Sequence, residues 1–141
     1  MNKDVILNKL SSLKRCLQRV EQKVPQTKQD LHNDLDSQDI ISLNLQRAVQ
    51  LCVDIAAFLA SDLDLATPLS MAEGFDRLEQ AKIISSSVCS RMKKAVGFRN
   101  IAVHDYCSID WDIVHAVSTT HIEDFKEFAR EVMDFLSNQK D

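Results

Sequence analysis

Apolar side chains recur every three or four residues along most of this chain, and this spacing constrains the fold more than any other feature. A repeat near 3.6 residues gives an α-helix one continuous apolar face, whereas a half-buried strand needs strict alternation. The chain has two Gly and two Pro in 141 residues, which leaves few turns for a sheet. The sequence therefore predicts an all-α fold, an antiparallel four-helix bundle with one additional short helix.

The apolar stripes and their end signals divide the chain into five expected helices. The first occupies about residues 6–24 and ends at Pro25, and a polar connection follows it. The others are expected at about 37–63, 70–81, 85–103 and 110–135. Ser70 and Glu73 have the spacing of a capping box, and Asp110 is a favourable N-cap.

The composition is that of a soluble globular protein, with 45% hydrophobic and 27% charged residues, so residues 1–141 are expected to form one domain. No apolar run approaches the roughly 18 residues that cross a bilayer, and the N-terminus lacks the apolar region of a signal peptide. We therefore expect a cytoplasmic protein without membrane contact.

Because no zinc-type spacing joins the four cysteines, we expect reduced thiols and no bound metal. They are Cys16, Cys52, Cys89 and Cys107.

The segment 99–106, Arg-Asn-Ile-Ala-Val-His-Asp-Tyr, carries the most informative chemistry. Arg99 offers a permanent planar charge for bidentate contact with a phosphate. His104 can take and return a proton near neutral pH. Tyr106 is the only tyrosine of the chain. Together these residues can bind a phosphate and transfer a proton without a metal ion.

Structural interpretations of the same residues remain open. Helical geometry places Arg99 in the apolar stripe of its helix, so Arg99 either pairs with an internal carboxylate such as Asp54 or faces a polar cleft. His104 lies about 140° around an ideal helix from Arg99, too far for both to contact one phosphate. The helix must therefore end or distort near Val103, or two chains must combine their residues. A histidine at a helix end is otherwise often a C-terminal cap.

The pattern Arg99-x4-His104-x-Tyr106 resembles the signature of HEPN-superfamily ribonucleases, in the form found in HepT-type toxins. Asn100 and the segments 43–48 (Leu-Asn-Leu-Gln-Arg-Ala) and 54–56 (Asp-Ile-Ala) are also similar to that family. The resemblance implies a homodimeric, metal-independent endoribonuclease without a cofactor, in which Arg99 and His104 are catalytic. It further implies a toxin of a type VII toxin–antitoxin system, neutralised when a partner nucleotidyltransferase adds AMP to Tyr106.

Neighbouring residues extend this expected site. Asn100 is expected to position Arg99 or a phosphate oxygen, and Asp105 either orients the imidazole or begins a polar loop. The stretch 80–104 contains no acid, so its basic residues are either RNA-binding candidates or a solvated helix face. These candidates are Arg91, Lys93 and Lys94. Phe98 and Ile101 project from one side of the helix as an apolar patch, which predicts a dimer interface.

A non-catalytic helical subunit is the alternative function, in which the same residues bind a nucleotide or the domain docks a nucleotidyltransferase. A DNA-binding dimer is disfavoured by the net charge of −4 and by the lack of helix-turn-helix spacing. His121 interrupts the last apolar stripe, so it is expected to be a hydrogen-bonded core histidine rather than a residue that lines the cleft. Trp111 is expected to pack as an anchor at the start of the last expected helix, at about 110–135.

Overall fold

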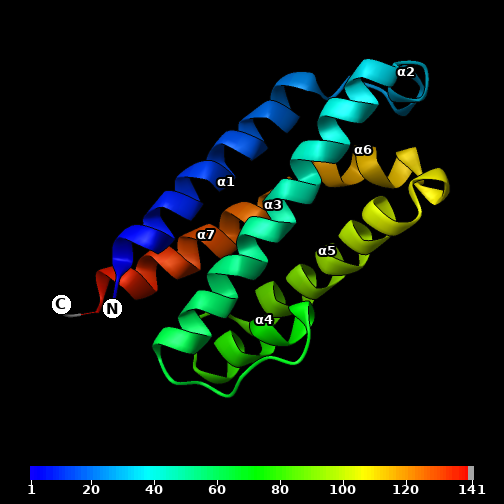
Figure 1. Ribbon diagram of the computed structural model, residues 1–141. Coiled ribbons are helices and arrows are strands. Elements are labelled where there is room, and N and C mark those ends of the chain that lie inside the picture. Colours follow the sequence, from blue (N-terminus) through cyan, green and yellow to red (C-terminus); the bar gives the residue numbers. More distant parts are fainter. Residues whose placement is uncertain (140–141) are drawn as a thin grey trace.

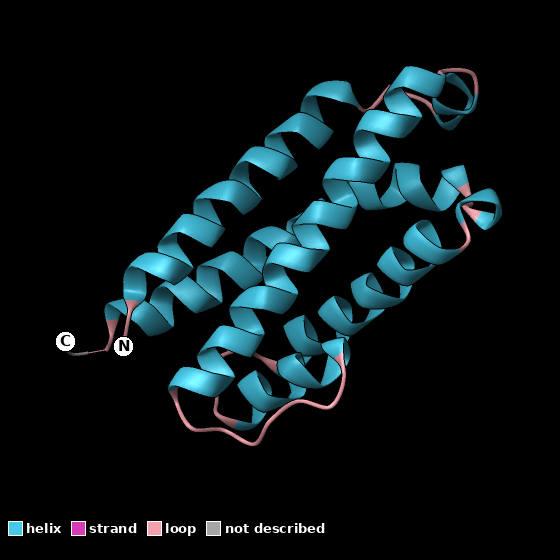
Figure 2. Ribbon diagram, viewed as in Figure 1, coloured by secondary structure: helices cyan, strands magenta, loops and turns pink. Residues whose placement is uncertain are grey.

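The computed structural model describes residues 1–139, which form seven α-helices and one short 3-10 helix. In chain order they are α1 (Lys3–Lys23), α2 (Lys28–His32), α3 (Leu35–Asp62), α4 (Met71–Gln80), α5 (Ser86–His104), η1 (Tyr106–Ser108), α6 (Trp111–Thr119) and α7 (Ile122–Ser137). Residues 1–139 contain no strand, so the all-α prediction is confirmed (Figure 2). Instead of one short helix, the described chain has three short α-helices besides four longer ones.

The long helix α3 lies at the centre of the molecule. It packs along α1 over most of its length and also contacts α4, α5 and α7. In Figure 1 the N- and C-terminal ends of the described chain lie near one another, at the end of the molecule away from α2 and η1. This arrangement brings the connection between α5 and α6 close to the beginning of α3, where Tyr106 contacts Asp39.

The apolar stripes meet in one continuous core. Phe75 of α4 and Phe128 of α7 are among its largest fully buried side chains, and their rings meet edge to face with centroids 5.6 Å apart. Burying each such side chain contributes roughly 1.5–3 kcal/mol. From α1 and α3, the largest fully buried side chains are Ile6, Leu13, Val20, Ile41, Leu45, Ile55 and Leu59. The residues predicted from the helical periodicity therefore supply the core.

Helix α3 is long and apolar enough to cross a bilayer when length and composition are the only criteria. The expectation that no apolar segment is long enough to cross a bilayer is therefore wrong for α3 when only length and composition are considered. Half of its most apolar window is buried inside the protein, and the central helices of soluble proteins also meet these criteria.

The connection expected after the first helix contains α2. The hydroxyl of Thr27 accepts a hydrogen bond from the backbone N–H of Asp30, which caps this short helix. Leu31 is fully buried and fixes α2 against the rest of the protein. The signal for this helix is the Thr27-x-x-Asp30 spacing, which the apolar periodicity does not contain.

The single last helix that the sequence predicted is divided into α6 and α7. The hydroxyls of Ser118 and Thr119 donate hydrogen bonds to the carbonyls of Val114 and His115, four residues earlier. Such bonds compete with the helical backbone pattern and bend helices. The backbone N–H of His121 then bonds five residues back, to Ala116, and α7 begins at the next residue.

Two predicted helix starts are confirmed. Ser70 accepts the backbone N–H of Glu73 at 3.2 Å, and the Glu73 carboxylate accepts the N–H of Leu69 at 3.0 Å, one residue before the expected partner. Asp110 caps α6 by accepting the N–H groups of its first turn. Trp111 packs against the core, as expected.

Candidate functional site

Arg99 lies in the C-terminal half of α5 and is partly buried. Its Nη1 donates to Oδ1 of the adjacent Asn100 at 3.3 Å, while its buried Nε has no hydrogen-bond partner within residues 1–139. A buried donor without an acceptor costs about 1–3 kcal/mol. The suggested pairing of Arg99 with Asp54 is not found, because Asp54 contacts Gln50 at 2.8 Å and Lys9 at 3.8 Å. Arg99 therefore presents an unused Nε donor, while its Nη1 contacts the side-chain amide of Asn100.

His104 is the last residue of α5 and is exposed. The helix remains regular from Arg99 to His104 and ends one residue after Val103, so it does not bring the two side chains onto one face. The imidazole has no hydrogen bond or ion pair to another described residue. The side chain of His104 therefore does not cap the end of α5 in the described chain. Both ring nitrogens are available to contact a ligand.

Asp105 lies at the C-terminal end of α5 and begins the turn η1. Its carboxylate accepts a hydrogen bond from the Ser108 hydroxyl at 2.7 Å, and its backbone carbonyl accepts the Ser108 N–H at 2.9 Å. No hydrogen bond joins Asp105 to the imidazole of His104 in the described chain. Of the two expectations for Asp105, the structure favours the polar turn, which fixes the direction in which the chain leaves α5.

Tyr106 follows this turn and contacts two other elements. Its hydroxyl donates to Oδ1 of Asp39 in α3 at 3.0 Å, and its ring meets Trp111 edge to face with centroids 5.9 Å apart. Burial, followed by the hydrogen bond and the charge of Asp39, raises the pKa of Tyr106 above its ordinary value of 10. Asp39 was not identified from the sequence, because 67 residues separate it from Tyr106 and no local pattern links them.

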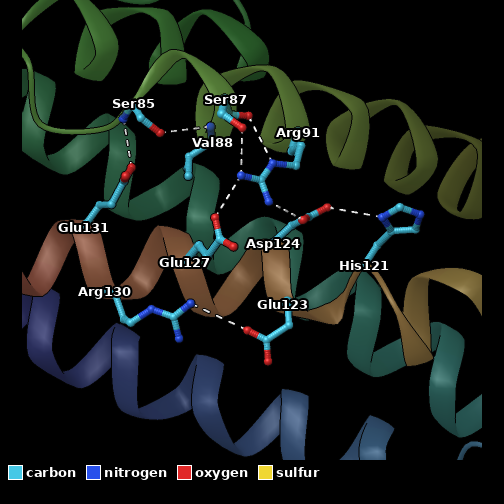
Figure 3. Close-up of polar contacts among 10 residues, drawn as sticks. All are labelled: Ser85, Ser87, Val88, Arg91, His121, Glu123, Asp124, Glu127, Arg130 and Glu131. Atoms are coloured by element: carbon cyan, nitrogen blue, oxygen red, sulfur yellow. Dashed lines mark hydrogen bonds and ion pairs between the residues drawn. The ribbon is translucent and has the colours of Figure 1, made fainter.

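The three basic candidates differ in how they use their charge. Arg91 donates to Asp124 and Glu127 of α7, both at 2.8 Å, and so ties α5 to α7 (Figure 3). Lys93 pairs with Asp76 at 3.0 Å. Lys94 is exposed and has no ion pair with another residue of the described chain. Of the three, Lys94 is the cation best placed to contact an outside phosphate.

The apolar patch predicted at Phe98 and Ile101 includes a third residue, Ile113 of α6. Ile101 and Ile113 are 49% and 53% exposed, whereas Phe98 is partly buried against the core. Phe98 and Ile113 line two adjacent hollows of about 200 and 250 Å³, the larger of which also includes Ile101. Phe98, Ile101 and Ile113 are called the isoleucine patch below.

The prediction of a core histidine at position 121 is wrong. His121 is exposed at the junction of α6 and α7, where its Nδ1 lies 3.7 Å from a carboxylate oxygen of Asp124 (Figure 3). The break between the two helices turns this residue away from the apolar stripe. It lines the smaller hollow together with Lys94 and Phe98.

Asp76, Glu79 and Cys89 bring three potential ligand atoms within 4.8 Å of one another. The Lys93 ammonium group already lies 3.0 Å from Asp76, and the Cys89 thiol donates to the same carboxylate at 3.6 Å. Burial raises the pKa of Cys89 to about 12, and the two neighbouring carboxylates add to this effect. A metal ion would need the thiolate. The cluster is therefore arranged as a neutral thiol beside a lysine–aspartate ion pair.

Similar proteins share both the sequence and the fold. The chain is 40% identical over 125 residues to the mRNA nuclease HepT of Shewanella oneidensis, covering 89% of this chain and 93% of that one. A structure of the tri-AMPylated HEPN toxin of the same organism in complex with the MNT antitoxin aligns with a TM-score of 0.87 at 39% identity. That alignment covers 95% of this chain and 99% of the other.

A more distant protein shares the fold. The cytosolic protein of unknown function YutE from Bacillus subtilis aligns with a TM-score of 0.83 at 15% identity, over 97% of this chain and 92% of that chain. The family model of HepT-like ribonucleases matches residues 13–132, which include every motif residue discussed above. The chain therefore belongs to the HepT-like ribonuclease family.

Proposed function

We propose that this protein is a metal-independent endoribonuclease and the toxin of a type VII toxin–antitoxin pair. The observation that carries the proposal is the buried Nε of Arg99, which has no hydrogen-bond partner in the described chain. A phosphate oxygen would accept from this atom and remove the cost of leaving it unpaired. The 40% identity to an mRNA nuclease supports RNA as the source of that phosphate.

The chemistry that these residues allow is a transesterification within RNA. Arg99 binds the scissile phosphate and stabilises the negative charge that increases in the transition state. His104 takes the proton of the ribose 2′-OH, whose oxygen attacks phosphorus, and the bond to the 5′ oxygen breaks as that oxygen receives a proton. The products are a 2′,3′-cyclic phosphate and a free 5′-OH. Lys94 would hold a neighbouring phosphate, and Asn100 keeps the guanidinium in place.

Two copies of the chain are needed for this reaction. Arg99 and His104 lie on one regular helix and point in different directions, so a single α5 cannot direct both side chains to one phosphate. A homodimer that joins the isoleucine patches would place two α5 helices side by side. One histidine can then act as base and the other as acid.

A partner nucleotidyltransferase would neutralise the toxin by adding AMP to Tyr106. Tyr106 is 43% exposed, and it lies two residues after His104. Each AMP adds negative charge and bulk where the RNA phosphate must bind, so the adduct would repel the substrate. Related toxins occur in complexes with nucleotidyltransferase antitoxins, including one that is tri-AMPylated.

The test is cleavage of RNA by the purified chain with and without EDTA. Wild-type cleavage is expected to survive EDTA and to leave cyclic phosphate ends. Arg99→Ala and His104→Ala should each slow cleavage by about 10²–10⁴-fold. Lys14→Ala is the control, because Lys14 is an exposed lysine of α1 in a different part of the fold, and it should cleave normally.

Three results separate this proposal from its alternatives. Full activity of His104→Ala would refute the catalytic assignment. Activity that is lost in EDTA and restored by Mg²⁺ would refute the metal-free mechanism. RNA that stays intact at all protein concentrations would leave the non-catalytic docking subunit as the better function.

A further inference from the structure

The contact between Tyr106 and Asp39 connects the modification residue to a carboxylate on another helix. The Tyr106 hydroxyl donates to Oδ1 of Asp39 at 3.0 Å, and no other hydrogen bond of this hydroxyl is found within residues 1–139. Asp39 lies in the second turn of α3 and is exposed. The contact therefore faces solvent, where a large enzyme can approach.

The geometry around the phenol is fixed from two sides. Trp111 holds the ring edge to face at an interplanar angle of 71°, and the Asp105–Ser108 hydrogen bond of 2.7 Å fixes the turn that carries Tyr106. Asp39 therefore contacts the one atom that must become a nucleophile. The phenolic proton already points to a base before any partner binds.

We propose that Asp39 accepts the phenolic proton of Tyr106 when the partner nucleotidyltransferase adds AMP to it, which rests on the function proposed above. The phenolic oxygen attacks the α-phosphorus of a nucleoside triphosphate held by the partner, and a new phosphorus–oxygen bond forms. The bond between that phosphorus and the bridging oxygen breaks, and pyrophosphate leaves with the electron pair. The proton of the hydroxyl moves to Oδ1 of Asp39.

A base in this position is useful because the resting phenol resists ionisation. Burial and the nearby carboxylate oppose formation of a free phenolate, so at neutral pH the reaction must begin from the neutral hydroxyl. Transfer of the proton to Asp39 as the new bond forms avoids a free phenolate. The aspartate that accepts the substrate hydroxyl proton in protein kinases works in the same way. The toxin would thus supply part of the chemistry that silences it.

The role of Asp39 can be measured with the full-length chain, its own nucleotidyltransferase partner and ATP. The single-turnover rate of AMP addition to Tyr106 is followed by intact mass between pH 6 and pH 10. Asp39→Asn keeps an oxygen that can accept the hydrogen bond but cannot take the proton. We expect it to slow transfer by about 10²-fold at neutral pH. The rate should recover towards pH 10, where the phenol ionises without help.

Asp36→Asn is the matched control. Asp36 lies in the first turn of the same helix, is also exposed, and has no hydrogen-bond or ion-pair partner for its carboxylate in the described chain. This variant changes the net charge by the same amount and should be modified at the wild-type rate at every pH. Unchanged circular dichroism and unchanged RNA cleavage by Asp39→Asn would show that its fold and its nuclease site are intact.

The outcomes separate this inference from the proposed function. If Asp39→Asn is modified at the wild-type rate with the same pH profile, the role of Asp39 is refuted while neutralisation by AMP stands. If both aspartate variants are equally slow, the effect is one of surface charge and the inference also falls. If wild-type Tyr106 receives no AMP although the partner still silences the nuclease, the proposed mode of neutralisation fails and this inference fails with it.

Discussion

At the scale of single residues, Tyr106 shows how one neighbour changes the acidity of a side chain. Its pKa is raised by burial first and then by the hydrogen bond and charge of Asp39. In an ultraviolet absorbance titration, the single tyrosine should therefore ionise above pH 10. Asp39→Asn should lower this midpoint, because it removes the negative charge beside the phenolate. An unchanged midpoint would mean that the carboxylate does not act on the phenol in solution.

The four thiols should differ sharply in reactivity. Cys16, Cys52 and Cys89 are buried, and burial raises the pKa of each, that of Cys89 to about 12. Because the thiolate is the reactive form, these three thiols should react slowly at pH 8. Cys107 is exposed in η1 and should be modified alone by a disulfide reagent in the native protein.

The control for this assignment is Cys107→Ser. It should abolish the fast reaction, while all remaining thiols should react once the protein is unfolded in guanidinium. A second thiol that reacts rapidly in the native wild-type protein would contradict the burial of the other three.

At the scale of elements, the scarcity of glycine affects the helix ends. Asp64 after α3 and Lys82 after α4 both have positive φ angles, 55° and 63°. Glycine usually occupies this backbone conformation at helix ends. In the second case the backbone N–H of Ile83 donates to the carbonyl of Leu78 at 2.9 Å, which closes the end of the helix. The two helices therefore end with side chains in a strained backbone conformation.

Replacing Lys82 by glycine should stabilise the protein. Lys82→Gly relieves the left-handed conformation and should raise the free energy of unfolding by roughly 0.5–1 kcal/mol, after subtracting the added freedom of the unfolded chain. Lys14→Gly is the opposite control, because Lys14 lies within α1. This variant should lower the free energy of unfolding by roughly 0.5–1 kcal/mol. Urea unfolding followed by circular dichroism measures both, and a loss for Lys82→Gly would contradict the assignment of strain.

Helix content could be predicted from the sequence, but helix junctions depended on signals outside the apolar pattern. The stripe from Val114 to Phe135 continues across the break between α6 and α7, so periodicity predicts one helix there. The break depends on side-chain hydroxyls, those of Ser118 and Thr119, that bond to the backbone. His121 was wrongly predicted to lie in the core because the break between α6 and α7 was not predicted.

At the scale of the whole molecule, the isoleucine patch predicts the oligomeric state. Ile101 and Ile113 are 49% and 53% exposed, so covering the rest of each side chain between two copies would contribute roughly 1 kcal/mol. The double variant Ile101→Lys with Ile113→Lys should therefore be monomeric in sedimentation experiments and should lose RNA cleavage. Phe98 is left in place, because it also packs against the core.

Leu69→Lys is the control for the patch variant. Leu69 is 86% exposed in the connection before α4 and lies outside the patch, so this change should leave the dimer intact. A wild-type protein that sediments as a monomer and still cleaves RNA at full rate would contradict both the interface and the need for two chains.

The motif residues could be found from the sequence because they are close together in it, on the last turns of α5 and in η1. The partners of those residues could not. Asp39 contacts Tyr106 across 67 residues, and the acids that occupy Arg91 belong to α7, so these contacts exist only once the helices have packed. The sequence indicates which groups are candidates for the chemistry, and the fold shows which of them are already paired with other residues.

The edge-to-face pair of Tyr106 and Trp111 has an optical consequence. The chain contains one tyrosine and one tryptophan, and their ring centroids lie 5.9 Å apart. Excitation energy absorbed by the Tyr106 phenol should transfer to the Trp111 indole. The fluorescence emission of Trp111 then reports on whether Tyr106 is modified. A charged nucleotide on the phenol would change that emission, so stopped-flow fluorescence could follow the proposed addition of AMP to Tyr106 in unlabelled protein.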